Sequence, residues 1–139
     1  MPTVARWFIK TGLICLILAL LIGILMTAGT SASFFPAVGR LFPIYLHLLV
    51  MGWITQLIFG VVYWMFPKYS KEKPRGSPTL GWITYAALNI GLLLRAVAEP
   101  MIATPPAWLW GWLLVLSALL QWIAGMAFVV NTWGRVKEK

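Results

Sequence analysis

"FPIYLHLLVMGWITQLIFGVVYWMFPKYS", residues 42–70, is the stretch that decides the fold. Between Pro43 and Pro67 it contains no Asp, Glu, Lys or Arg. It is therefore long and apolar enough to span a hydrocarbon core of roughly 30 Å, which takes about 20 helical residues. It also holds the only histidine of the chain, His47. A histidine inside such a run is costly unless it bonds a neighbouring group, a metal or a pigment, so His47 bears on function.

The composition assigns the chain to the integral membrane proteins. Hydrophobic residues make up 61% of its 139 residues and charged residues 10%, which leaves too much apolar surface for one water-facing core. We expect a single transmembrane domain, 1–139, with the lipid bilayer as its main partner. The net charge of +8 does not indicate nucleic-acid binding, because the basic residues stand at the ends of apolar runs rather than in one patch.

Four apolar runs, at about 8–27, 44–66, 80–98 and 107–130, are each long enough to cross a bilayer. Prolines, glycines or charged residues separate them. In lipid the backbone polar groups of a segment must be satisfied within it or by closing a barrel, and alternation with a period of two is absent. The sequence therefore predicts an all-α fold, an integral membrane four-helix bundle.

The distribution of lysine and arginine predicts the orientation. Most basic residues fall on one side of a four-helix weave: Arg6, Lys10, Lys68, Lys71, Lys73, Arg75, Arg135, Lys137 and Lys139. That side should be cytoplasmic, which puts both termini of this multi-pass protein in the cytoplasm. Most tryptophans stand near the predicted interfaces, while Trp53 and Trp122 stand deepest and are predicted to pack inside the bundle.

A helical wheel gives the second run two distinct faces. His47 shares a stripe with Met51, Ile54 and Ile58. The opposite face is small and polar, and it carries Tyr45, Gly52, Gln56 and Gly60. Small residues allow close helix approach and an amide can bond across helices, so Gly52, Gln56 and Gly60 are predicted to form an interface.

The segment "HLLVMGWITQLIFGVVYWMFP" resembles helix 2 of heme-copper oxidase subunit I. The resemblance is closer to short four-helix membrane proteins that are similar to subunit I of cbb3-type oxidases. The following "PRGSPTLGWITYAALNIGLLLRAVAEP" is similar to the next helix of those proteins and of NnrS-like membrane proteins. The likeness covers about residues 40–100, and its most specific feature is the order His, Gly-Trp, Gly, Tyr, Pro within one helix.

This resemblance implies a heme b whose iron is bound axially by His47 near the outer face. The family's heme histidine aligns with Tyr45 rather than His47, and tyrosine is a rarer heme ligand. Arg40 and Arg95 lie on the same predicted side and would suit the heme propionates, although Arg95 and Glu99 are also spaced to pair with each other. The expected partners are other membrane subunits or a second copy of the chain, in a bacterial inner membrane.

The same resemblance predicts an electron-transfer or accessory subunit of a respiratory or photosynthetic complex. With one histidine the chain lacks the ligands of an oxidase binuclear centre, so it is not expected to be an enzyme on its own. Two alternatives stay open. One is a cofactor-free structural or assembly subunit, and the other is a protein that binds a chlorophyll-type pigment through His47.

Overall fold

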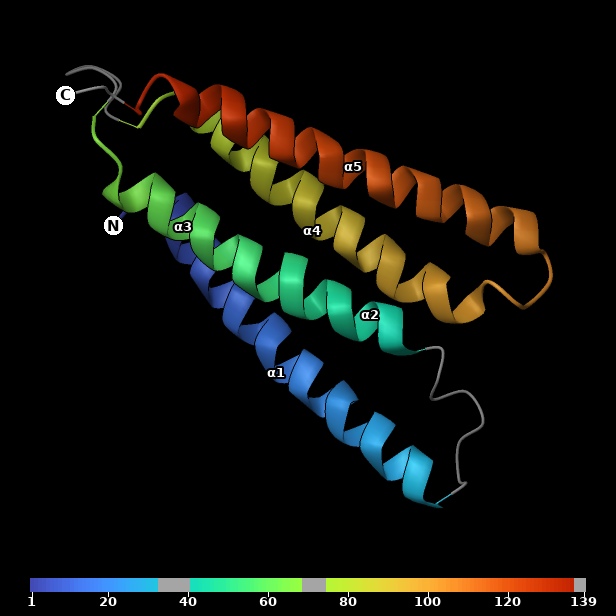
Figure 1. Cartoon of the computed structure of the whole chain (residues 1–139). Coiled ribbons are helices and arrows are strands. Elements are labelled where there is room, and N and C mark those ends of the chain that lie inside the picture. Colours follow the sequence, from blue (N-terminus) through green and yellow to red (C-terminus); the bar gives the residue numbers. More distant parts are fainter. Residues whose placement is uncertain (33–40, 69–74, 137–139) are drawn as a thin grey trace.

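The computed structural model describes residues 1–32, 41–68 and 75–136. Its described residues form helices that make up four long rods (Figure 1). The second rod consists of three consecutive helical segments. The elements are α1 (Thr3–Ala32), α2 (Phe42–His47), η2 (Leu48–Thr55), α3 (Gln56–Met65), α4 (Pro78–Met101) and α5 (Ala107–Trp133).

All four rods are long and apolar enough to cross a membrane, which confirms the predicted all-α class with four spans. The clearest difference is in α1, which begins at Thr3 rather than at residue 8. The N-terminus and the last turn of α5 lie at the same end of the bundle (Figure 1). That this end is cytoplasmic stays a prediction from the basic residues.

Prolines and one serine cap define where the spans begin and end. Pro43 stands in the first turn of α2. A backbone N–H at that position has no partner within the helix, so the N–H that proline lacks is not needed there. At the other end of this rod Phe66 is extended, with ψ of 151°, and Pro67 follows it. Ser77 caps α4 by accepting a hydrogen bond from the Leu80 N–H at 3.4 Å, and Pro78 follows.

Small residues let the helices approach closely within this chain. A Cβ on Gly52 would lie 2.8 Å from Cys15 Cβ of α1, and one on Gly60 would lie 3.2 Å from the Ala5 carbonyl oxygen of the same helix. In the other helix pair, the Ser117 hydroxyl of α5 donates to the Gly91 carbonyl of α4 at 2.6 Å. The chain thus consists of two closely packed hairpins, α1 with the second rod and α4 with α5.

The second rod changes its winding directly after His47. Leu48–Thr55 is π-helical, whereas the segments before and after it are α-helical. Such wide turns are uncommon and often mark functional sites. Despite this change, Gly52, Gln56 and Gly60 are all buried.

Arg135 joins the end of α5 to the end of the second rod. Its guanidinium is fully buried and donates to the carbonyls of Pro67 at 3.0 Å and Phe66 at 2.8 Å. These carbonyls follow the last turn of α3, where a helix leaves acceptors without partners. Burial lowers the pKa of Arg135, which the nearby Tyr63 partly offsets, but a guanidinium stays charged at neutral pH.

Asn131 reinforces the same end of the bundle. Its side-chain amide donates to the Tyr63 hydroxyl and to the Ser77 carbonyl, each at 3.1 Å, and its oxygen accepts from the Ser77 N–H at 2.8 Å. The sequence predicts for Arg135 only a place on the cytoplasmic side, whereas the structure gives it a role in packing. Together, Asn131 and Arg135 tie the two hairpins together at this end.

The prediction that Trp122 packs inside the bundle is wrong. Trp122 is 63% exposed on the outer side of α5, because Ala124, Ala127 and Ser117 provide the buried face of that helix. Trp53 is half-buried. Depth along a span therefore did not indicate which side of the helix faces protein.

We predict that Gly52→Ala lowers the free energy of unfolding by about 1–3 kcal/mol, the usual cost of overpacking, because the added methyl overlaps Cys15 and Leu92. Gly111→Ala is the matched control, since a Cβ there meets no atom within 4 Å. Reversible denaturation in mild detergent measures both. Equal stability of the two variants would refute the close packing at Gly52.

Candidate functional site

His47 lies at the end of α2, one turn after Pro43. Its Nδ1 lies 2.8 Å from the Pro43 carbonyl oxygen, and its Nε2 lies 2.8 Å from Nη1 of Arg95 on α4. A carbonyl only accepts and a guanidinium only donates, so the imidazole carries its proton on Nδ1 and its lone pair on Nε2. The arrangement holds a neutral histidine in one defined tautomer.

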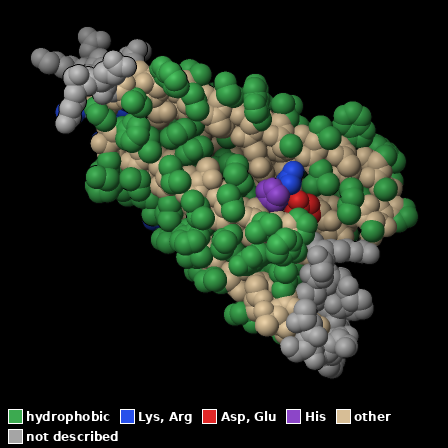
Figure 2. Space-filling model, in the orientation of Figure 1, with side chains coloured by type: hydrophobic (Ala, Val, Ile, Leu, Met, Phe, Trp, Pro, Cys, Tyr) green, Lys and Arg blue, Asp and Glu red, His purple; other side chains and the backbone are tan. Residues whose placement is uncertain are grey.

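Arg95 and Glu99 complete a cluster with His47. Arg95 Nη1 donates to Glu99 Oε1 at 3.1 Å, which confirms the predicted pairing of these residues. The same oxygen lies 3.8 Å from His47 Nδ1. With His47 neutral, the cluster carries one positive and one negative charge. Figure 2 shows it together on one face of the molecule, among hydrophobic side chains.

The cluster is partly exposed, and not all of its polar atoms have partners. The Glu99 side chain is 9% exposed, that of Arg95 20% and that of His47 28%. Arg95 Nε and Glu99 Oε2 are buried without a hydrogen-bond partner among the described residues. One donor and one acceptor are thus left for a group outside the described chain.

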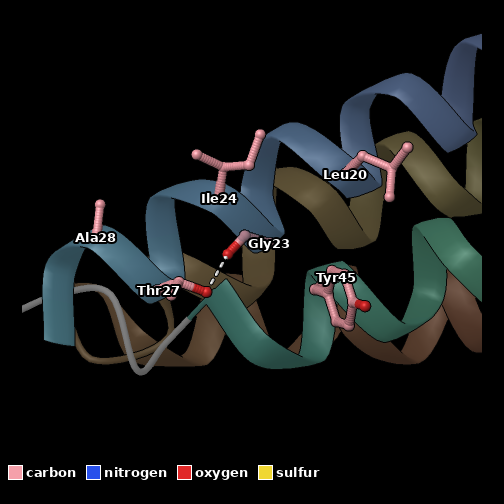
Figure 3. A pocket seen from close by; sticks show the side chains of 6 residues that line it. All are labelled: Leu20, Gly23, Ile24, Thr27, Ala28 and Tyr45. Atoms are coloured by element: carbon pink, nitrogen blue, oxygen red, sulfur yellow. Dashed lines mark hydrogen bonds between the residues drawn. The ribbon is translucent and has the colours of Figure 1, made fainter. Parts of the chain in front are cut away.

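The structure separates Tyr45 from His47. Tyr45 faces α1, where a Cβ on Gly23 would lie 3.4 Å from its ring (Figure 3). The Tyr45 ring lines a shallow hollow of about 650 Å³ with Gly23, Thr27 and other residues of α1. Since His47 instead contacts α4, the two side chains cannot serve one cofactor from the same side.

The remaining predicted residues divide into two groups. Arg40 lies outside the described residues. Gly52, Gln56 and Gly60 form the contact with α1 within this chain. Their role as an interface to another subunit stays a prediction.

Two polar side-chain pairs inside the bundle join α4 to other helices. The side-chain amides of Gln56 and Asn89 bond each other reciprocally, at 3.2 and 3.3 Å, which joins the second rod to α4. The hydroxyls of Thr11 and Tyr85 lie 2.7 Å apart and join α1 to α4. The Thr11–Tyr85 pair was not predicted, because neither residue stands out in an apolar helix before its neighbour is known.

A groove of about 560 Å³ runs between α1, the second rod and α4. It is lined mainly by aliphatic side chains such as Ile44, Leu48, Leu92 and Ala96, with Thr11, Tyr85 and Asn89 among its other residues. The polar pairs already use these three side chains. His47 lines neither this groove nor the hollow at Tyr45.

Within residues 1–32, 41–68 and 75–136, no three His, Cys, Asp or Glu side chains gather as a metal site would require. Searches of protein-family models, curated proteins and solved structures find no match to this chain. The cluster of His47, Arg95 and Glu99 is therefore the candidate site on its geometry alone.

We predict that Arg95→Met destabilises the protein by about 3–5 kcal/mol, because it leaves the Glu99 carboxylate buried without its cation. The double variant Arg95→Met/Glu99→Leu should regain most of that loss, since it removes both charges. Denaturation in mild detergent measures the cycle, with Glu99→Leu as its fourth member. Additive effects of the two substitutions would show that the pair is not coupled.

Proposed function

We propose that this chain is a small subunit of a larger membrane assembly and that His47 ligates a heme b on its outward face. The observation that carries the proposal is the partly exposed cluster of His47, Arg95 and Glu99 at membrane depth. Ionisable groups are rare in membrane spans and mark functional sites by default. The resemblance to subunit I of heme-copper oxidases adds the identity of the cofactor.

The tautomer of His47 suits metal ligation. A ligating histidine usually donates its other ring N–H to a carbonyl or carboxylate, which orients the ring, and Nδ1 of His47 does so toward Pro43. Nε2 keeps the lone pair that iron would need. His47 would thus hold the iron through Nε2, on the condition that Arg95 releases that nitrogen.

Arg95 keeps other partners if it releases Nε2 of His47. It stays paired with Glu99 on its own helix, and its guanidinium would suit a heme propionate. A bound heme b would supply one-electron transfer. Because His47 is the only histidine of the chain, a second imidazole ligand would have to come from another chain, which agrees with a subunit of an assembly.

One observation favours a second candidate, a cofactor-free structural subunit. Nε2 of His47 accepts a hydrogen bond from Arg95 at 2.8 Å, so both ring nitrogens are satisfied within the chain. In that case the cluster would serve only to hold α2 against α4 and to contact a neighbouring subunit.

The protein purified in mild detergent should show a b-type α-band in its dithionite-reduced minus oxidised spectrum, and His47→Ala should abolish it through loss of the axial ligand. Ile58→Ala, at a lipid-facing position of the same rod, is the matched control and should keep the band. Pyridine hemochrome gives the heme per chain.

The other outcomes separate the alternatives. A full heme signal in folded His47→Ala would contradict ligation by His47. Intact wild-type protein without heme would favour the structural subunit, and a far-red band in its place would favour a pigment.

A further inference from the structure

The groove between α1, the second rod and α4 has the size and the lining of a ligand site. Its volume of about 560 Å³ lies within the range of roughly 300–1,000 Å³ for such sites, which are mainly apolar with a few polar groups. Its polar side chains, Thr11, Tyr85 and Asn89, lie toward one end, and aliphatic residues follow as far as Ile22 on α1 and Pro100 on α4. At about 1.5 Å per residue the groove is roughly 16–22 Å long. It is therefore elongated, with one polar end.

At the polar end, every hydrogen that the three polar side chains can donate already has an acceptor. The Asn89 amide donates to the Tyr85 carbonyl at 2.8 Å and to the side-chain oxygen of Gln56 at 3.3 Å. The Thr11 hydroxyl donates to the Trp7 carbonyl at 2.8 Å, so the 2.7 Å contact between the Thr11 and Tyr85 hydroxyls uses the proton of Tyr85. An amide nitrogen has two hydrogens and a hydroxyl has one, so no donor is left over.

Acceptors do remain at the polar end. Asn89 Oδ1 accepts one bond, from Gln56 Nε2 at 3.2 Å, although an amide oxygen has two lone pairs. Among the described residues, the Tyr85 hydroxyl bonds only that of Thr11, to which it donates, so its own lone pairs are free. A ligand that donates a hydrogen can bond here without breaking a contact, whereas a ligand that only accepts must displace one. The polar end therefore favours a donor.

The depth of the polar end restricts the ligand further. Tyr85 stands seven residues after Pro78, the first residue of α4, or about 10 Å along the axis. Thr11 stands eight residues after Thr3, the first residue of α1, or about 12 Å. At that depth a charged group is costly. The phosphate of a phospholipid is therefore unsuited to the polar end, whereas a neutral hydroxyl suits it.

We propose that the groove binds a neutral lipophilic molecule with a hydroxyl group, a long-chain alcohol or phenol, which donates to the free acceptors of Tyr85 and Asn89. Its apolar chain lies along the aliphatic part of the groove, past Leu92 and Ala96 toward Pro100. A phospholipid acyl chain in the same space leaves these acceptors unused. His47 does not line the groove, so the proposal does not rest on a heme.

Photolabelling in phosphatidylcholine nanodiscs tests the site in the full chain. The probe is para-dodecylphenol with a diazirine at the end of its alkyl chain, and it has to displace phospholipid chains to enter the groove. With the hydroxyl at the polar end, the label should fall on residues of the aliphatic part, such as Ile22, Ala96 or Pro100. Unlabelled para-dodecylphenol should compete about tenfold better than its methyl ether, which keeps the oxygen but lacks the hydrogen. Dodecanol in the same competition distinguishes an aliphatic from a phenolic hydroxyl.

Two pairs of variants test the two parts of the groove. Tyr85→Phe removes one acceptor and should lower the preference for the phenol over its methyl ether. Tyr63→Phe is its control and should keep the preference, because the Tyr63 hydroxyl bonds Asn131 outside the groove. Ala96→Phe fills the aliphatic part and should lower the labelling itself, so it serves if Tyr85→Phe fails to fold. Ala86→Phe, at an exposed position of the same helix, should leave the labelling unchanged.

Equal competition by the phenol and its methyl ether would overturn the proposal. Undiminished labelling in folded Ala96→Phe would do the same, as would label spread evenly over lipid-facing residues such as Val115, which is 57% exposed on α5. Label at Thr11 would also contradict it, because the alkyl end rather than the hydroxyl would then lie at the polar end.

Discussion

The constraint on which this structure depends is that polar atoms in hydrocarbon must find their partners within the protein. Gln56 and Asn89 satisfy each other's amides, and the Ser117 hydroxyl bonds the Gly91 carbonyl. These bonds connect helices that are otherwise held by aliphatic and aromatic contacts. They fix which helices lie together, because a lipid tail is as apolar as leucine and apolar contacts alone discriminate poorly between neighbours.

At the end of the bundle the same constraint gives Arg135 its structural role. The carbonyls that follow the last turn of α3 have no N–H donor within their own helix, and the buried Arg135 guanidinium donates to them. Four buried side-chain atoms of the described residues have no hydrogen-bond partner: Arg95 Nε, Glu99 Oε2, Trp110 Nε1 and Arg135 Nη1. Two of the four belong to the cluster of His47, Arg95 and Glu99, where the constraint is met least well.

The features that depend on composition and on helical period could be predicted from the sequence. Four apolar runs predicted four spans, and the wheel placed Tyr45, Gly52 and Gly60 on one face, which the structure turns toward α1. What it could not predict depends on the identity of neighbours. The Thr11–Tyr85 contact, the outward side chain of Trp122 and the separation of Tyr45 from His47 all follow from which helices pack together. The π-helical turns after His47 contain no proline that would mark them. A helical wheel with a period of 3.6 therefore could not predict them.

In the proposed function, His47 has one lone pair for two partners. The Pro43 carbonyl holds the proton on Nδ1, so Nε2, which bonds the Arg95 guanidinium, would have to leave that partner to ligate a metal. A hydrogen bond to a charged group contributes about 1.5–3 kcal/mol, and Arg95 would keep its bond to Glu99 when Nε2 turns to iron. The imidazole contact that Arg95 would give up is therefore one hydrogen bond of the two that its Nη1 makes. In the structure itself, the same contact leaves both ring nitrogens of His47 bonded within the chain.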